Sequence, residues 1–441
     1  MMEKEELKQY MKQLQTKGSV YGLDTIKELL QRLGNPQEQL QIVHIAGTNG
    51  KGSTLAMIDS VVRNAGYNCG RYSSPTIDTY LERFQINGRY MEEKEWVHCM
   101  CMVIEQAQEM EQAGYVHPTA FEIETAVAFV WFLQKKVDLV LLETGLGGRM
   151  DATNVITKPI VTLFASISRE HMGILGDTVE EITIEKSGII KEGCPVIVYP
   201  NEQNIQAILK EQAKEHHSSC ICIQKEEIQK KEQTRNGQVF VYQGEEFKIS
   251  LFGDHQMYNA TVAIEAIQQL RNQSFLITQE ALKEGLRLAK WNGRFEVVQQ
   301  FPDWILDGAH NEDAARKLKE SLEQYVSFCF TKPRIFYIIG VFKDKEYETI
   351  VSTTAELADV IVTVEANDPH RTLASSELAQ VARTYHNNVI DAKHIRNGIA
   401  LVKELAKKED LVIVFGTLSL LGEAKEAIQE AYGSSKSNFI S

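Results

Sequence analysis

The stretch from Ile42 to Ser53 constrains the fold of this chain more than any other segment. An apolar run, Ile42–Ala46, leads into Gly47-Thr48-Asn49-Gly50-Lys51-Gly52-Ser53, and helical periodicity continues from about Ser53 to Ala65. Glycines let backbone N–H groups approach a polyphosphate, a lysine supplies a positive charge, and a helix N-terminus attracts anions. A strand, a glycine-rich loop and a helix in this order therefore predict a phosphate-binding loop.

The spacing of this loop departs from the common G-x-x-x-x-G-K-[ST] pattern. Only Thr48 and Asn49 separate Gly47 from Gly50, and Gly52 stands between the lysine and the serine. The loop alone indicates a polyphosphate ligand but leaves open which kind of nucleotide enzyme carries it.

Length and composition limit the remaining possibilities. A chain of 441 residues exceeds what one hydrophobic core usually serves, so we expect two domains. The polar, acidic N-terminus is unlike a signal peptide, and the longest apolar run, around residues 126–133, is too short to cross a membrane. The net charge of −13 argues against a nucleic-acid-binding surface, and the seven cysteines match no zinc or redox spacing. We expect a cytoplasmic monomer that acts on small molecules.

Short Val/Ile-rich runs alternate with helical periodicity, which is typical of an α/β fold with a mostly parallel sheet. The alternation restarts after residue 294, so we expect an N-terminal domain at 1–292 and a smaller, Rossmann-like α/β domain at 293–441. Strands are predicted at 41–46, 69–72, 137–143, 160–165, 195–199, 295–300, 304–307, 334–340, 360–365 and 411–415, and a hairpin at 238–251. Helices are predicted at 3–15, 53–65, 121–135, 179–191, 203–215, 256–271, 279–288, 311–325, 375–385 and 396–408.

Further residues suited to chemistry follow the predicted strands of the first half. Glu143 opens the loop Glu143–Asn154, where a carboxylate is suited to hold a metal beside a phosphate, although a solvated turn is the alternative. Ser74 precedes a proline and is either a magnesium ligand or a turn residue. His171 follows the strand 160–165 and is either an active-site or a structural histidine. Lys186, in a helical segment, is by itself typical of a solvated lysine.

The second half repeats this arrangement at its own strand ends. Asp307 and His310 lie in Asp307-Gly308-Ala309-His310-Asn311, between a predicted strand and a predicted helix. Arg294 lies at the expected domain boundary, where it forms either a phosphate clamp on domain closure or an interdomain salt bridge. Arg371 follows another strand and is a candidate anion ligand.

Taken together and in this order, these motifs closely resemble the folylpolyglutamate synthase family of the Mur ligases, which includes bifunctional bacterial enzymes that are also dihydrofolate synthases. The resemblance extends from about Leu23 to Leu420. The phosphate loop is shared across the Mur ligases, whereas Glu143-Thr144-Gly145-Leu146-Gly147-Gly148-Arg149-Met150-Asp151-Ala152-Thr153-Asn154 is the stretch that indicates the folate branch.

The resemblance implies ATP as a cosubstrate and two magnesium sites. It implies a carbamylated Lys186, because a carbamate converts a metal-repelling cation into an oxygen-donating anion. The metal ligands implied are Ser53, Ser74, Glu143, His171 and Lys186. The ATP contacts implied are Thr48, Asn49, Gly50, Lys51, Gly52, Ser53, Asn259, Arg294 and Asp307.

The resemblance also implies how the substrates bind and react. Thr119, Phe121 and Arg83 match pterin-contacting segments, although a helix start with a buried Phe121 is the alternative, and Phe84 stands where an aliphatic residue is common. Lys51, Lys186 and His310 are the implied catalytic residues, with His310 as a base. The implied reaction joins L-glutamate to a reduced folate or dihydropteroate through an acyl phosphate. Another Mur-type amide ligase and a non-catalytic nucleotide switch are the alternatives.

Overall fold

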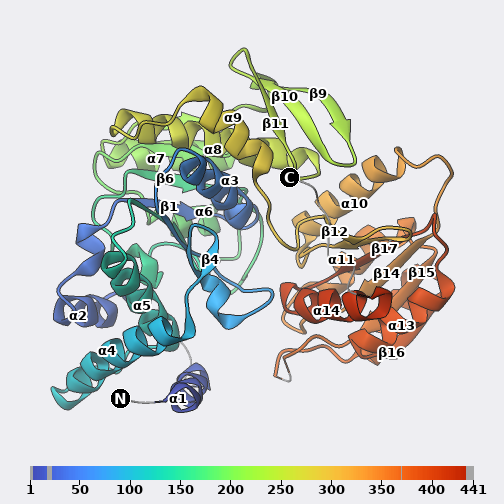
Figure 1. The fold of residues 1–441 in the computed structure, drawn as a ribbon, viewed down its shortest axis with the longest axis horizontal. Helices are drawn as coiled ribbons and strands as arrows, with labels where there is room; N and C mark the ends of the chain where they lie inside the picture. Colours follow the sequence, from blue (N-terminus) through green and yellow to red (C-terminus); the bar gives the residue numbers. More distant parts are fainter. Residues whose placement is uncertain (1–2, 17–21, 369, 434–441) are drawn as a thin grey trace.

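The computed structural model describes residues 3–16, 22–368 and 370–433, and these form two α/β units joined by the segment 289–295. Figure 1 shows the units side by side, the first from blue to yellow and the second from orange to red. This confirms the α/β fold class expected from the sequence. Within the described residues, no helix combines the length and apolar character needed to cross a membrane.

The first unit is built on an eight-stranded sheet. Its strands are β1 (Ile42–Ala46), β2 (Cys69–Tyr72), β3 (Phe84–Ile86), β4 (Arg89–Tyr90), β5 (Leu139–Glu143), β6 (Val161–Phe164), β7 (Val196–Val198) and β8 (Cys220–Cys222). The order is β4-β3-β2-β5-β1-β6-β7-β8, parallel from β2 to β8 and antiparallel at β3 and β4. β1, β5 and β6 are buried at every residue, as expected for parallel strands covered on both faces.

Helices cover both faces of this sheet. One face packs against α3 (Lys51–Asn64), α8 (Asp254–Asn272) and α9 (Gln279–Leu288). The other packs against α1 (Lys4–Thr16), α2 (Asp24–Arg32), α4 (Glu93–Gln112), α5 (Ala120–Gln134), α6 (Val179–Ser187) and α7 (Gln203–Glu215). Short 3-10 turns lie at Pro36–Gln39, Tyr80–Arg83, Ala152–Val155, Lys225–Glu227, Ala355–Leu357 and Leu418–Leu420.

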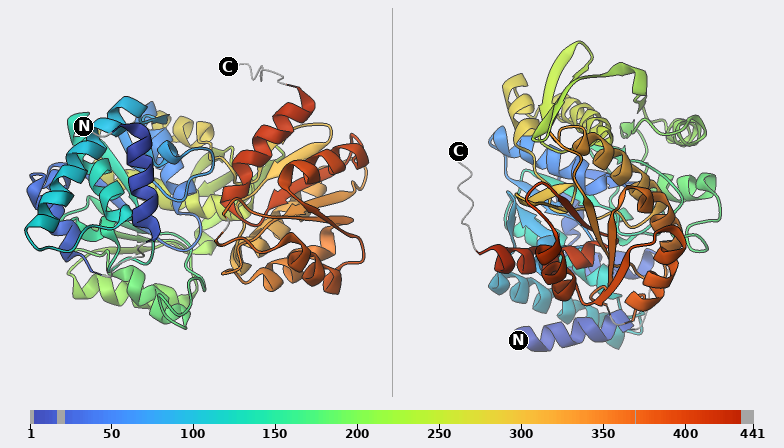
Figure 2. Two further views of the ribbon diagram at one scale, coloured as in Figure 1. Left: turned by 90° about the horizontal axis from the view of Figure 1, so that it is seen from below. Right: turned by 90° about the vertical axis from the view of Figure 1, so that its right-hand side faces the viewer.

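The second unit has a six-stranded sheet covered by five helices. Its strands are β12 (Glu296–Gln299), β13 (Asp303–Leu306), β14 (Ile335–Ile339), β15 (Val360–Val364), β16 (Val389–Lys393) and β17 (Leu411–Phe415), in the order β12-β13-β17-β14-β15-β16 with only β12 antiparallel. The first face packs against α10 (Glu312–Val326), α11 (Tyr347–Thr354) and α12 (Ser375–Tyr385), and the second against α13 (Ile395–Leu405) and α14 (Leu421–Tyr432). Figure 2 shows these helices on the two sides of the sheet.

A small antiparallel sheet reaches from the first unit toward the second. It contains β9 (Ile228–Thr234), β10 (Gly237–Tyr242) and β11 (Glu245–Ile249), and β11 packs against α9. The hairpin predicted at 238–251 corresponds to β10 and β11, with Gly244 in the turn. Gln233 Nε2 donates to Gln324 Oε1 at 3.1 Å, and Arg235 donates to Asp303 at 3.2 Å, so this sheet contacts the second unit directly.

One predicted helix is shorter than expected. The periodicity predicts a helix over 179–191, but α6 ends at Ser187. The carbonyl of Gly188 accepts a hydrogen bond from Asn154 Nδ2 instead of continuing the helix. A Cβ atom at Gly188 would lie 2.5 Å from the Cα of Arg149, so the glycine lets the Glu143–Asn154 loop pack against the end of α6.

Candidate active site between the two units

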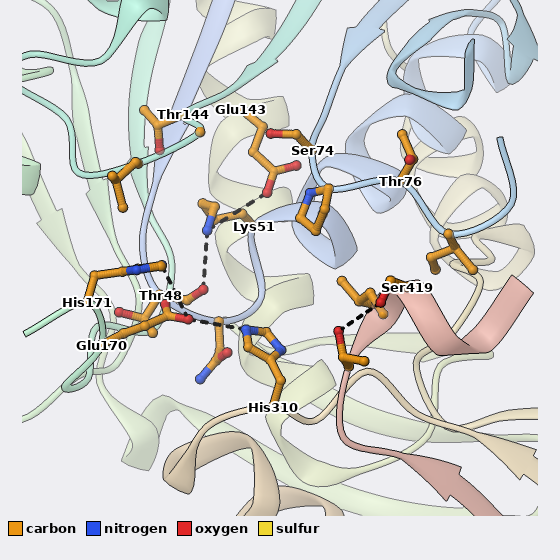
Figure 3. Close-up of a pocket in the computed structure, with 18 of the residues that line it drawn as sticks. Thr48, Lys51, Ser74, Thr76, Glu143, Thr144, Glu170, His171, His310 and Ser419 are labelled. Carbon is orange, nitrogen blue, oxygen red and sulfur yellow. Dashed lines mark hydrogen bonds and ion pairs between the residues drawn. The ribbon is translucent and has the colours of Figure 1, made fainter. Parts of the chain in front are cut away.

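The strand ends of the two units enclose one cavity of about 460 Å³. The first unit lines it with the phosphate loop and with the loops that follow β2, β5 and β6, and the second unit contributes the loops after β13, β14, β15 and β17. Figure 3 shows Lys51 pointing toward Glu143 on one side, and His310 pointing toward Glu170 from the second unit. In open α/β sheets this edge is where ligands bind.

Packing explains why the phosphate loop contains three glycines at this unusual spacing. Gly47 and Gly50 have positive φ angles of 152° and 93°. A Cβ atom would lie 2.8 Å from the Cβ of Ala165 at Gly47, and 2.5 Å from Oδ1 of Asn259 at Gly50. At Gly52 a Cβ atom would lie 2.6 Å from the indole of Trp291. The short loop therefore fits against β6, α8 and the connecting segment at the same time.

Lys51 is held over its own loop. Its Nζ donates to the carbonyls of Gly47 at 3.0 Å and Thr48 at 3.2 Å, and it lies 3.9 Å from Oε1 of Glu143. The phosphate loop thus places the cation of Lys51 beside the carboxylate of Glu143 at the N-terminus of α3. That pairing suits a site where a phosphate and a divalent cation bind together.

Four of the five predicted metal ligands line this cavity: Ser74, Glu143, His171 and Lys186. Burial raises the pKa of Glu143 to about 7, against the opposing charges of Lys51, Arg294 and Arg71. Among the described residues no three His, Cys, Asp or Glu side chains gather into a complete metal site. Glu143 and Ser74 nevertheless offer the oxygen donors that magnesium prefers, so this side of the cavity fits a magnesium ion. Oxygen atoms of the substrate and of water would complete the coordination shell of that ion.

The interpretation of Lys186 as a solvated lysine is wrong, because its side chain is only 4% exposed. Its Nζ donates to the carbonyl of Gly47 at 3.0 Å. Burial, followed by repulsion from Lys51, lowers the pKa of Lys186 to about 7. Burial likewise lowers the pKa of His171 to about 4, which keeps its imidazole neutral and able to bind a metal.

A smaller cavity of about 50 Å³ adjoins the phosphate loop and brings together the predicted ATP contacts of both units. Asn259 Oδ1 and Ser53 Oγ are buried here without a hydrogen-bond partner among the described residues. Asp307 accepts hydrogen bonds from the backbone N–H groups of Phe295 and Ala309, both at 2.9 Å. The residues from the prediction that line this cavity are Asn49, Gly50, Ser53, Asn259, Arg294 and Asp307. Ser53 faces this side rather than the cavity that contains Glu143.

His310 makes two hydrogen bonds, and both partners are acceptors. Nδ1 lies 2.7 Å from the carbonyl oxygen of Gly308, and Nε2 lies 3.2 Å from Oε1 of Glu170. Burial acts to raise the pKa of Glu170, but the hydrogen bond and charge of His310, with Lys345 and Lys51, hold that pKa well below its usual value. Each ring nitrogen of His310 therefore faces an oxygen acceptor, an arrangement suited to a ring that donates on both sides.

The predicted pterin contacts are only partly at the cavity. Arg83 lines it, stacks on Tyr80 at 4.6 Å and pairs with Glu124. Thr119 does not line it; its hydroxyl accepts a hydrogen bond from the N–H of Glu122 and caps α5.

Neither phenylalanine of these segments lines the cavity. Phe121 is half-buried, and a Cβ atom at Gly145 would lie 2.5 Å from its ring, so the loop packs directly against this ring. Phe84 is fully buried against Tyr72, so its departure from the common aliphatic residue does not alter the cavity lining.

Other cavity residues carried too weak a signal in the sequence to be singled out. Glu170 directly precedes the predicted ligand His171, which was its only indication. Lys345 donates to Glu170 at 3.3 Å from the second unit. Trp291 and Ser419 also line the cavity, and nothing in their local sequence distinguishes them from core or turn residues.

Comparisons with known proteins agree with this geometry. Residues 45–267 match the Mur ligase middle domain, and residues 293–418 match the Mur ligase glutamate ligase domain. The chain is 35% identical to the dihydrofolate synthase/folylpolyglutamate synthase of Bacillus subtilis over 431 residues, which covers 92% of this chain and 95% of that protein.

Two solved structures of relatives share both the fold and nearly the whole length. The chain is similar to Escherichia coli FolC in complex with DHPP and ADP, with 26% identity, a TM-score of 0.83, and coverage of 97% of this chain and 98% of that one. It is also similar to a bifunctional folylpolyglutamate synthase/dihydrofolate synthase with Mn, AMPPNP and L-glutamate bound, with 27% identity, a TM-score of 0.82, and coverage of 96% and 98%.

Proposed function

The chain belongs to the Mur ligase family of folylpolyglutamate and dihydrofolate synthases, and we propose from that premise that it uses ATP to join L-glutamate to reduced folates and to dihydropteroate. It is an ATP-dependent amide-forming ligase. The observation that best supports the substrate assignment is that residues of both units line one cavity, with the phosphate loop and Glu143 facing His310 and Arg371.

The first step proposed is transfer of the γ-phosphoryl group of ATP to a folate carboxylate. A carboxylate is a poor electrophile, and an acyl phosphate makes its carbon reactive toward an amine. Lys51 would neutralise the negative charge of the phosphoryl group during transfer, and the N–H groups at the start of α3 would hold the phosphates. A divalent cation bound by Glu143 and Ser74 would add further charge neutralisation when present.

The second step proposed is attack by the amine of L-glutamate on the acyl phosphate, with release of phosphate. Arg371 lines the cavity from the second unit, where its guanidinium stacks on Phe342 at 4.3 Å and pairs with Asp344. A planar guanidinium binds carboxylates in a defined orientation. We assign Arg371 to a carboxylate of the incoming glutamate. Closure of the proposed domains, 1–292 and 293–441, would exclude the water that otherwise hydrolyses the acyl phosphate.

We propose that His310 supports this reaction as a cation rather than as a base. Its imidazole lines the cavity beside Glu170 and the phosphate loop, and a protonated ring there would stabilise the negative charge that develops as phosphate leaves. We further propose that the protein is a cytoplasmic monomer. Its sedimentation coefficient at micromolar concentration tests the oligomeric state.

The experiment that tests the function is an assay of ADP release with two pteridine substrates in parallel. Purified protein, ATP, Mg²⁺ and L-glutamate are combined with either dihydropteroate or tetrahydrofolate, and the products are identified by mass. We expect ADP release that requires both glutamate and a pteridine, and a loss of at least about 100-fold in Lys51→Ala. Lys408→Ala serves as a matched control, because Lys408 is exposed before β17, at the sheet edge opposite the cavity.

Activity with both pteridines supports a bifunctional enzyme, and activity with tetrahydrofolate alone restricts the proposal to folylpolyglutamate synthesis. If no pteridine elicits glutamate-dependent ADP release, the substrate assignment is wrong. Release of ADP with a different acid would then favour another Mur-type ligase, and binding of ATP without any turnover would favour a nucleotide switch.

A further inference from the structure

The side chain of Asn49, in the phosphate loop, makes its hydrogen bonds to the second unit. Its Nδ2 donates to Oδ1 of Asn311 at 3.1 Å and to Oδ2 of Asp313 at 2.9 Å, and Nδ2 of Asn311 donates back to Oδ1 of Asn49 at 3.2 Å. Asn311 also caps α10 by accepting from the N–H of Ala314. The carboxamide of Asn49 is thus bound to the first turn of α10.

The backbone of Asn49 is connected to the same helix through Ser166. The carbonyl of Ser166 accepts from the N–H groups of Thr48 at 2.7 Å and Asn49 at 3.1 Å. The hydroxyl of Ser166 accepts from Nζ of Lys317 at 3.0 Å, and Lys317 also donates to Oδ2 of Asp313 at 2.6 Å. One carboxylate on α10 therefore binds both Asn49 and the lysine that holds Ser166.

These contacts join the phosphate loop itself to the second unit, in addition to the contacts made by the small sheet and by Glu170. The side chains of Asp313 and Lys317 are 15% and 14% exposed, so their hydrogen bonds lie largely out of water. Hydrogen bonds to ionised groups are stronger than neutral ones, and separation of the units would leave Asn49 and Ser166 without these partners. The bonds can exist only while α10 lies against the phosphate loop.

We propose that Asn49, Asp313 and Lys317 form a closure latch, in which Asp313 is a positioning residue that acts through Asn49. When the units close, Asp313 binds the carboxamide of Asn49 and fixes the phosphate loop in its catalytic geometry. When they open, the loop loses this restraint. In this arrangement the side chain of Asn49 contributes to the reaction by holding the phosphate loop in place when the units close, and not by contacting a phosphate. The catalytic part of this inference rests on the proposed function, whereas the closure part does not.

The first test compares the turnover of single and double variants. We expect Asp313→Ala and Asn49→Ala each to lower kcat by about 10-fold with a smaller change in the KM for ATP, because nucleotide can enter the open state. Because both substitutions remove one interaction, the double variant should lose about 10-fold in total rather than about 100-fold. Asp313→Asn keeps an acceptor for Asn49 and should recover most of the turnover, which a general structural defect would not allow.

Arg316→Ala is the matched control on the same helix. Arg316 donates to Asp313 Oδ1 at 2.7 Å and to Glu320 at 2.9 Å, both on α10, and its side chain is 56% exposed. Arg316 shares the carboxylate of Asp313, but both of these partners lie on α10 within the described residues, so the kcat of Arg316→Ala should be unchanged. Independent losses in Asp313→Ala and Asn49→Ala that multiply in the double variant would overturn the latch.

The second test measures closure without any folate. Small-angle X-ray scattering in the presence of ADP should give a larger radius of gyration for Asp313→Ala than for the unaltered protein, with Arg316→Ala unchanged. Equal radii in all three proteins would overturn the proposal even if turnover falls. If no pteridine supports turnover, the function proposal fails while this measurement still decides the latch. Should Asp313→Ala not fold, Lys317→Met carries the same scattering test.

Discussion

The carboxylate of Glu170 in the first unit accepts a hydrogen bond from Nε2 of His310 in the second, at 3.2 Å. The other ring nitrogen of His310 lies 2.7 Å from the carbonyl oxygen of Gly308, so both ring nitrogens face acceptors. The same carboxylate bonds to Lys345 at 3.3 Å. Glu170 therefore binds two side chains of the second unit, His310 and Lys345, at the wall of the cavity.

This arrangement predicts the pH behaviour of a His310→Ala variant. If His310 acts as a cation, its removal should lower kcat by about 100-fold near neutral pH, and raising the pH should not restore the variant, because hydroxide does not replace the lost charge. If it acts as a base, the variant should recover about 10-fold per pH unit above neutrality as the attacking amine loses its proton unaided. Single-turnover rates between pH 7 and 9.5 distinguish the two, and a slope near one for the variant would contradict the cationic role.

The contact of Trp291 with Gly52 predicts an unusual pair of substitutions. Gly52→Ala should lower kcat by about 10-fold or more, because its Cβ atom would lie 2.6 Å from the indole and displace the phosphate loop. Trp291→Ala removes that obstacle but also the stacking of Arg71 at 4.5 Å. The Gly52→Ala/Trp291→Ala double variant should therefore be more active than Gly52→Ala alone.

Steady-state ADP release measures this recovery, and thermal unfolding of each variant serves as the control for folding. A double variant as weak as the product of the two single losses would show that the glycine is needed for a reason other than its contact with the indole. The result thus decides why the loop has a glycine between its lysine and its serine.

The same contacts show how far local sequence can predict this site. The phosphate loop and the Glu143–Asn154 loop were found because strand, glycine and charge are neighbours in the chain. The contacts of Gly52 with Trp291 and of Asn49 with Asp313 could not be predicted in this way. Each pair is more than 200 residues apart in the chain, and no motif surrounds Trp291 or Asp313. Burial of Lys186 also depends on the packing of α6 against a distant loop.

The fold itself was predicted best where strands are buried on both faces. Apolar runs such as Leu139–Glu143 identify such strands without any knowledge of their partners. The polar strand β9 was missed, because only pairing with β10 makes it extended. The helix α4 was also missed, although Trp96, Met100 and Val103 share its buried face at helical spacing and offered a readable signal.

Lys186 is predicted to carry a carbamate. Its lowered pKa of about 7, caused first by burial, leaves much of the amine neutral at physiological pH. A neutral amine adds to CO₂ to form a carbamate with loss of one proton. In the presence of ¹³C-bicarbonate the unaltered protein should show a carbamate carbon resonance that is absent from Lys186→Ala. Lys191→Ala, in the nearby loop, should retain it. Absence of the signal from the unaltered protein at neutral pH would contradict the modification.

His44, at the centre of β1, is predicted to make the stability of the protein fall in weak acid. It is fully buried, and burial lowers its pKa to about 3 in the folded state, whereas an unfolded histidine titrates near 6.5. Below pH 6.5 His44 binds a proton in the unfolded chain, whereas it stays neutral in the folded chain until the pH approaches 3. The free energy of unfolding should therefore fall by up to about 1.4 kcal/mol per pH unit between pH 6.5 and 3 from this residue alone.

Because other groups titrate in the same range, the effect is isolated as a difference between variants. His44→Gln keeps a partner for Thr153, whose hydroxyl lies 2.9 Å from Nε2 of His44, and removes the titration. Urea unfolding at several pH values should show the unaltered protein losing stability relative to His44→Gln as pH falls from 6.5. His217→Gln is the control, since that side chain is 82% exposed and its variant should follow the unaltered protein. If the difference in the free energy of unfolding between the unaltered protein and His44→Gln does not change with pH, His44 is protonated equally in the folded and unfolded states.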